Sequence, residues 1–138
     1  MESETKPKML SLVFVFDAQK RVLLGKKKRG FGAGNYNGFG GKQEAGETMR
    51  QCAARELLEE SGVSVEPKLL ARRGILSFDM LSDGMVSAGG TVASRLEVHV
   101  FSCMHGETTG EIVESEEMAP EWWAVDSVPY AQMWVDDE

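Results

Sequence analysis

The chain has 138 residues, of which 42% are hydrophobic and 27% charged, and this composition is typical of a single globular domain with its own core. Its formal net charge of −7 argues against a nucleic-acid polymer as partner, because the chain has no surplus of Lys and Arg to neutralise a phosphate backbone. No apolar run could span a membrane, the charged opening MESETKPK does not resemble a signal peptide, and there are only two cysteines. We therefore expect a cytoplasmic protein without membrane contact, and a mitochondrial or nuclear pool stays open.

Two apolar segments near the N-terminus predict a β-hairpin. Residues 9–16 (MLSLVFVF) are rich in Val and Phe and predict a buried strand. Residues 21–25 (RVLLG) predict the returning strand, and residues 17–20 (DAQK) predict the turn between the two.

A basic run at residues 26–29 (KKKR) leads into a glycine-rich segment at residues 30–42. The basic run by itself fits a solvated strand end as well as a binding site. Glycine lets a backbone approach a ligand closely, although flexible linkers have a similar composition. Because the segment leads directly into an acidic helix, we expect it to be a loop on the phosphate side of a binding site.

The next segment predicts a helix with both ends marked. Thr48 and Gln51 form a capping-box pattern, and Glu47 lies where the helix dipole favours an acid. Gly62 is a suitable left-handed stop.

Three glutamates of this helix, Glu56, Glu59 and Glu60, fall within a wedge of about 100°. Each like-charged pair costs roughly 0.2–0.5 kcal/mol in an isolated helix, and only Arg55 is near to compensate. A divalent cation removes this conflict, and ligands that are all oxygen suit Mg²⁺ or Mn²⁺.

Two long strands are predicted after the helix, at residues 69–81 and 91–104, with a loop of small residues at 82–90 between them. The alternation in the second strand predicts that His99 and Phe101 lie on its polar face. His99 there is expected to be an ordinary strand histidine.

The end of the chain predicts one more strand and a second helix. Residues 121–125 (EWWAV) predict a short strand, and a last helical turn capped by Asp126 or Ser127 is expected to extend through Trp134. The whole order predicts an α/β (α+β) sandwich in which helices cover a sheet.

A spaced motif runs from the glycine-rich segment through the helix. Five, seven, one and one residues separate its fixed groups, which are Gly41, Glu47, Arg55-Glu56-Leu57, Glu59-Glu60 and Gly62-Val63. Seven of these nine positions are fixed to one residue type. With about one chance in fifteen at each of the seven, a random match is on the order of one in 10⁸ per starting point, so an acidic surface helix is the minor alternative. The motif is identified as the Nudix box. The resemblance to the Nudix hydrolase family implies hydrolysis of a nucleoside diphosphate linked to another group, by a single α/β/α sandwich domain over residues 1–138 with a mixed sheet flanked by helices.

The similarity extends beyond the box to eukaryotic Nudix enzymes that sanitise the nucleotide pool and so prevent DNA damage. It rests on the segments VLLGKKKRGFGAGNYNGFGGK, VHVF, ESEEM and MWVDD. The resemblance implies magnesium-dependent hydrolysis of oxidised purine nucleoside triphosphates (8-oxo-dGTP and 2-oxo-dATP) to the monophosphate and pyrophosphate, with Mn²⁺ as the alternative ion. We expect the protein to be a monomer.

This chain departs from those enzymes at several positions. Leu12 replaces a polar Thr of the pocket, Asn35-Tyr36 replace Arg-Trp, and Val135 replaces Pro. The family has a further strand beyond the equivalent of Glu138, so we expect a chain that is either truncated or closes its sheet differently.

The resemblance assigns functional residues position by position. It implies a substrate-binding set of Lys27, Phe31, Asn37, Phe39, Gly40, Gly41, Lys42, Trp134, Asp136 and Asp137. It implies a metal-binding set of Glu56, Glu59, Glu60 and Glu117, with the Gly40 carbonyl as a further ligand.

The catalytic residues are expected to be Glu56, Glu60, Arg55 and Glu47. One glutamate should deprotonate the attacking water, with Glu56 as first choice and Glu60 as close rival. Arg55 is expected to orient the carboxylates through an i,i+4 pair with Glu59, while Glu47 helps to hold the loop.

We expect three residues near the C-terminus, Trp134, Asp136 and Asp137, to select the base. Trp134 offers a stacking face, although it could equally anchor the last helix. Asp136 and Asp137 are adjacent, and in a desolvated pocket one of them would be protonated, so that together they present a donor and an acceptor. The side-chain amide of Asn37 can both donate and accept hydrogen bonds.

Three alternatives remain open at this point. The first is a Nudix enzyme for methylated purine triphosphates, dinucleoside polyphosphates or nucleotide sugars. The second is a nucleotide-binding module that does not hydrolyse its ligand, although every glutamate and the arginine of the box are present. The third is a structural domain, which leaves the carboxylate wedge unexplained.

Overall fold

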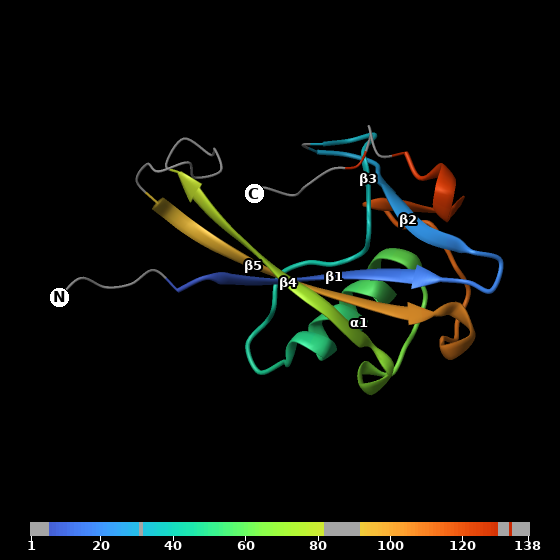
Figure 1. Cartoon of the computed structure of the whole chain (residues 1–138), viewed down its shortest axis with the longest axis horizontal. Coiled ribbons are helices and arrows are strands. Elements are labelled where there is room, and N and C mark those ends of the chain that lie inside the picture. The colour runs from blue at the N-terminus through green and yellow to red at the C-terminus, as the bar shows by residue number, and fades with distance from the viewer. Residues whose placement is uncertain (1–5, 31, 82–91, 130–132, 134–138) are drawn as a thin grey trace.

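The computed structural model describes residues 6–30, 32–81, 92–129 and 133. Within these ranges the chain forms one mixed sheet of six strands and a single α-helix, α1 (Met49–Ser61), which lies beside the sheet (Figure 1). The strands are β1 (Lys8–Phe16), β2 (Arg21–Lys27), β3 (Tyr36–Asn37), β4 (Ala71–Leu81), β5 (Val92–Met104) and β6 (Met118–Ala124). This arrangement confirms the predicted combination of a mixed sheet with a helix.

The strand order is β3–β2–β1–β5–β4, and β6 pairs with β2. β1 and β5 are parallel, from Lys8 beside Leu96 to Phe16 beside Met104, while the other strand pairs are antiparallel. β4 and β5 pair with each other and are the two long strands that overlap in the view of Figure 1. The parallel β1–β5 pair therefore forms the centre of the sheet.

The predicted N-terminal hairpin is confirmed. The Asp17 carboxylate accepts hydrogen bonds from the backbone N–H groups of Gln19 and Arg21 at 3.0 and 2.8 Å, and it pairs with the Arg21 side chain at 2.6 Å. Lys20 takes a left-handed conformation with φ of 61° to complete the turn. Asp17 thus accepts the free N–H groups of the turn and fixes the position at which β2 begins.

The main core lies between the sheet and α1. Val13 on β1 and Phe101 on β5 are neighbours in the parallel register, and both are fully buried with Leu57 of α1. The prediction that Phe101 and His99 lie on a polar face was wrong, because the helix packs on that side and His99 is only 6% exposed. β5 carries apolar residues on both faces, and alternation alone does not show which face a helix covers.

Two other predictions about the elements need correction. The short strand β3 was expected to be part of the glycine-rich loop, but it pairs with β2 through Asn37 and Tyr36. The start of the predicted second helix is a single 3₁₀ turn, Val125–Ser127, and most of its remaining residues lie outside the described ranges. The described part of the chain thus has a helix layer on one face only. None of its helices has the length and apolar character needed to cross a membrane.

The glycine-rich segment runs beside the first part of β1, which β2 does not reach, before it enters α1 (Figure 1). Ser11 N–H donates to the Gly41 carbonyl at 2.9 Å, and Val13 and Phe39 exchange backbone hydrogen bonds of 2.6 and 3.0 Å. The fit at Gly40 is tight, since a Cβ there would lie 1.8 Å from the Ser11 carbonyl oxygen. This segment therefore lies beside β1 like a short additional strand.

Candidate active site

Both ends of α1 are fixed as the sequence predicts. The Thr48 hydroxyl accepts from Gln51 N–H at 3.1 Å, and the Gln51 side chain accepts from Thr48 N–H at 2.8 Å. Gly62 ends the helix in a left-handed conformation with φ of 82°. With its ends set, the helix presents Ala53 and Leu57 to the core and turns its acidic side toward the glycine-rich segment.

Arg55 is the centre of an ion-pair network at the start of this acidic side. Its guanidinium donates to both oxygens of Glu47, at 3.0 and 2.8 Å, and to the Lys42 carbonyl at 3.0 Å. The predicted pair with Glu59 is present at 3.3 Å, but Glu59 is the more exposed and weaker partner. The hydrogen bond from Arg55 holds the pKa of Glu47 at about 2, and the same contact raises the pKa of Arg55. Arg55 thus fastens the loop before the helix to the helix itself.

Glu56 and Glu60 lie directly against the backbone of two consecutive glycines. Glu60 accepts a hydrogen bond from Gly40 N–H at 3.0 Å. A Cβ on Gly41 would come within 2.4 Å of a Glu56 carboxylate oxygen. Both glutamates are partly buried, and a side chain at Gly41 would displace the Glu56 carboxylate from its place.

The electrostatics of these two carboxylates favour a bound cation. Burial, with the neighbouring charge of Glu56, raises the pKa of Glu60 to about 8. Burial also raises the pKa of Glu56, although Arg55 at 3.0 Å opposes the shift. Carboxylates that are desolvated and close together keep their charge only with positive compensation, so Glu56 and Glu60 fit a hard divalent ion.

The four glutamates of the predicted metal set are not gathered around one point. Glu59 is 57% exposed beside Arg55, and Glu117 lies in the loop before β6, where it pairs with Arg29. Among the residues that the structure describes, no three acidic, His or Cys side chains form a ready-made metal cage. Glu56 and Glu60, which lie against the backbone of Gly40 and Gly41, are thus the two best-positioned ligands of the candidate metal site.

A cavity of about 220 Å³ opens on the side of β1 that faces away from α1. Its apolar wall consists of Leu10, Leu12, Leu76, Phe78, Val98, Met118 and Met133. Polar groups come from Asn37 and from the glycines at 38, 40 and 41. Gly40 and Gly41 therefore border the cavity and also contact Glu60 and Glu56.

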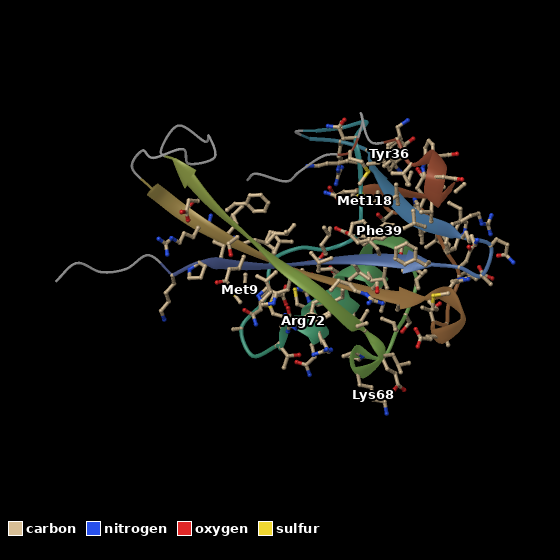
Figure 2. All side chains as sticks on the ribbon, viewed as in Figure 1. Met9, Tyr36, Phe39, Lys68, Arg72 and Met118 are labelled. Atoms are coloured by element: carbon tan, nitrogen blue, oxygen red, sulfur yellow. The ribbon has the colours of Figure 1, made fainter. Side chains whose placement is uncertain are left out.

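The structure brings together only part of the predicted substrate-binding set. Asn37, Gly40 and Gly41 line the cavity. Phe39 does not line this cavity: its ring is fully buried beside Gly25 and Met118. Figure 2 shows the labelled Phe39 and Met118 as neighbours. The alternation of the segment sends Phe39 into the core while its neighbours face the ligand side.

The two predicted lysines lie near the cavity without lining it. Lys42 is exposed and uses its carbonyl to hold Arg55. Lys27 ends β2, and its backbone bonds to Gly34 and Asn35 shape the glycine turn. The remaining predicted residues, Phe31, Trp134, Asp136 and Asp137, lie outside the described ranges.

Several cavity residues were missed from the sequence, although the resemblance had already placed Leu12 in the pocket. Leu76 and Phe78 alternate on β4, and Leu10 and Leu12 alternate on β1, so each pair shares a face. This two-residue period was the available signal, but it could not show that the two strands contribute to one cavity. Met118 and Met133 carried no local signal, because their positions depend on long-range pairing of β6 with β2 and of Met133 with Tyr36.

Comparison with known proteins gives matches over nearly the whole chain. The profile of the NUDIX domain matches residues 7–138. The chain is 46% identical over 130 residues to the oxidized purine nucleoside triphosphate hydrolases of Danio rerio and Mus musculus, covering 94% of this chain and 74% of each relative. The crystal structure of a MutT protein from Bacillus halodurans is similar with a TM-score of 0.74 and 29% identity, covering 91% of this chain and 74% of that one.

Proposed function

Because this chain belongs to the Nudix family, we propose that it is a hydrolase of oxidised purine nucleoside triphosphates, such as 8-oxo-dGTP and 2-oxo-dATP, and that it releases the monophosphate and pyrophosphate. One observation carries this proposal: the apolar cavity and the acidic side of α1 meet at the backbone of Gly40 and Gly41. A purine base in the cavity directs its phosphates across these glycines toward Glu56 and Glu60. The names of relatives that are 46% identical support the choice of substrate.

We propose Mg²⁺ as the ion, with Mn²⁺ as a substitute, held by Glu56, Glu59, Glu60 and Glu117 and by the Gly40 carbonyl. When bound, such an ion neutralises phosphate charge and acidifies a bound water. The protein itself has a net charge of −7 and would otherwise repel a triphosphate. Metal binding is therefore a condition for substrate binding as well as for chemistry.

Glu56 is the proposed general base, and Glu60 is the rival. Arg55 donates to Glu56 at 3.0 Å, which favours the ionised form that a base needs. Burial raises the pKa of Glu60 to about 8, which favours its neutral form, so Glu60 is less suited to act as a base. Arg55 acts as a positioning residue, because its donors are committed to Glu47, to Glu56 and to the Lys42 carbonyl.

The cavity wall also favours a second candidate substrate class, methylated purine triphosphates. Leu12, Met118 and Met133 offer a methyl group an apolar and adaptable surface. The polar contacts that would distinguish an oxidised base come from Asn37 among the described residues and from the proposed Asp136 and Asp137.

We further propose that residues 1–138 form one domain, that the protein is a monomer and that it works in the cytoplasm. The support for a reducing compartment is that Cys52 and Cys103 are both free and buried. The proposed partners are nucleoside triphosphates, without nucleic-acid polymers.

The test is steady-state hydrolysis with Mg²⁺ of 8-oxo-dGTP, 2-oxo-dATP, O6-methyl-dGTP and dGTP, with products separated by ion exchange. We expect pyrophosphate, and a kcat/KM for the oxidised bases above that for dGTP. Release of orthophosphate would overturn the proposed position of attack. A preference for the methylated base would shift the assignment to the second class, and binding without turnover would indicate a module that has lost catalysis.

A further inference from the structure

An acidic turn, residues 114–117, is fastened to the basic end of β2. Lys28 donates its backbone N–H to the Glu117 carbonyl at 2.9 Å and its ammonium group to the Ser115 carbonyl at 2.8 Å, and it also pairs with Glu114. The Ser115 hydroxyl accepts from the backbone N–H of Glu117 and Met118 at 3.3 and 3.1 Å. The backbone of this turn is therefore fixed by bonds that do not involve the Glu117 carboxylate.

The Glu117 carboxylate is oriented by a different residue, Arg29. Both Nε and Nη2 of Arg29 donate to the same oxygen, Oε2, at 3.2 and 2.9 Å, and Nη2 also reaches Glu116 at 3.1 Å. The other oxygen of Glu117 has no hydrogen bond or ion pair among the described residues. A carboxylate has acceptor sites on both oxygens, so Arg29 can hold one of them while the other accepts an ion.

Glu117 comes directly before an element that packs against the helix. The next residue, Met118, begins β6, which contacts α1, and its side chain packs against the core cluster that contains Leu57 of α1. The turn before β6 therefore lies close to α1, and Arg29 holds the Glu117 carboxylate at this place.

We propose that Arg29 is a positioning residue for the metal site, which holds Oε2 of Glu117 and so presents Oε1 to the ion bound by Glu60. This inference rests on the proposed function, in which Glu117 is a metal ligand. Hydrogen bonds to a ligating carboxylate orient it, and their loss typically costs about 10–100-fold in metal affinity.

The simpler interpretation is an exposed surface ion pair, because the side chains of Arg29 and Glu117 are 60% and 56% exposed. Such pairs are worth about 0–1 kcal/mol and carry no function. The two interpretations predict opposite changes in metal affinity when Arg29 is replaced. A cation that is merely near a metal site repels the metal, so its removal should tighten metal binding, whereas removal of a positioning residue should weaken it.

The experiment measures Mn²⁺ binding to the metal-free full chain by electron paramagnetic resonance, without nucleotide. Arg29→Gln is compared with Lys26→Gln, which removes the same charge three positions earlier in β2, and with Glu116→Gln, which removes the other partner of Arg29. We expect about tenfold or more weakening for Arg29→Gln, and affinity equal to or above wild type for Lys26→Gln. Glu116→Gln should bind as wild type does.

Two further variants test the role of Arg29 separately from the proposed metal site. They are Glu117→Gln and the double variant that combines Glu117→Gln with Arg29→Gln. If Arg29 acts through Glu117, the double variant binds Mn²⁺ no more weakly than Glu117→Gln alone. Unchanged affinity in Glu117→Gln would remove Glu117 from the metal set. Weakened affinity in Glu117→Gln, with wild-type or tighter binding in Arg29→Gln, would overturn the role of Arg29 and leave the metal set intact.

Discussion

Arg55 binds both carboxylate oxygens of Glu47, from Nε to Oε2 at 3.0 Å and from Nη2 to Oε1 at 2.8 Å. The two residues are eight positions apart, so the contact joins the loop before α1 to the middle of the helix. The fork geometry of arginine fits a carboxylate in this way, and lysine could not reproduce it. The pair sets where Glu56, the next residue in the helix, lies against Gly41.

The first prediction concerns the stability that this pair supplies. Glu47→Gln should lower the free energy of unfolding by about 1–3 kcal/mol, because Arg55 is then left partly buried without its charged partner. Glu44→Gln is the matched control, since Glu44 is 68% exposed and 3.7 Å from the same guanidinium. Its cost should stay below about 0.5 kcal/mol in urea unfolding at neutral pH. Equal losses in the two variants would contradict this account of the network.

The second prediction is the pH dependence of the difference in unfolding free energy between wild type and Glu47→Gln. The hydrogen bond from Arg55 lowers the pKa of Glu47 from 4.5 to about 2 in the folded state. A lowered pKa means that the stabilisation is complete above about pH 4.5 and is lost as the pH falls toward 2. The gap in unfolding free energy between wild type and Glu47→Gln should therefore shrink steadily over this window. A gap that is constant with pH would show that the charge of Glu47 does not matter.

The third prediction concerns Glu60, whose pKa moves in the opposite direction. Burial raises it to about 8, so the folded state favours the neutral form and the metal-free protein loses stability as the pH rises from about 4.5 to about 8. Thermal unfolding in EDTA should show this decline, and Glu60→Gln should flatten it. Added Mg²⁺ should raise the midpoint more at about pH 8 than at about pH 5.5, because Glu60 is then protonated in fewer molecules and binding displaces fewer protons. The same decline in Glu60→Gln would assign it to other groups.

The parts of this fold that the sequence predicted are those that short-range rules decide. The capping box of Thr48 and Gln51 and the stop at Gly62 depend only on neighbouring residues, so they could be placed without the structure. The location of Phe39 in the core could not, because it follows from pairing with Val13 on a strand far away in the chain.

The candidate site shows the same division. The box spacing placed Glu56 and Glu60 on one side of α1, since helix geometry fixes that relation. It did not show that Glu47, rather than Glu59, is the principal partner of Arg55, because the loop conformation decides this contact. The cavity depends on how β1, β4 and the glycine-rich segment meet, and no local pattern encodes that meeting.

The fourth prediction separates two adjacent glycines. A Cβ on Gly41 would meet the Glu56 carboxylate at 2.4 Å, and this group is the end of a flexible side chain that can move away. Gly41→Ala should therefore leave stability nearly unchanged but lower kcat by about 10²-fold, because the carboxylate is displaced from its working position. A Cβ on Gly40 would meet the Ser11 carbonyl at 1.8 Å, so Gly40→Ala should cost about 1–3 kcal/mol or more of stability. The two effects are measured by turnover and urea unfolding, and the same loss of stability in both variants would refute the distinction.

The last prediction concerns the wall of the base cavity. Phe78 on β4 lines the cavity, whereas Ile75 on the same strand faces the other way and is 47% exposed. Stacking of a base on an aromatic ring is worth about 1–3 kcal/mol, so Phe78→Ala should raise KM for 8-oxo-dGTP by about 5- to 150-fold. The change in kcat should be smaller, since Glu56 and Glu60 lie on the other side of the glycine segment. Ile75→Ala controls for general loosening of β4 and should leave KM within about twofold of wild type. If both variants raise KM equally, the cavity is not where the base binds, and the nucleotide must approach the acidic helix from another side.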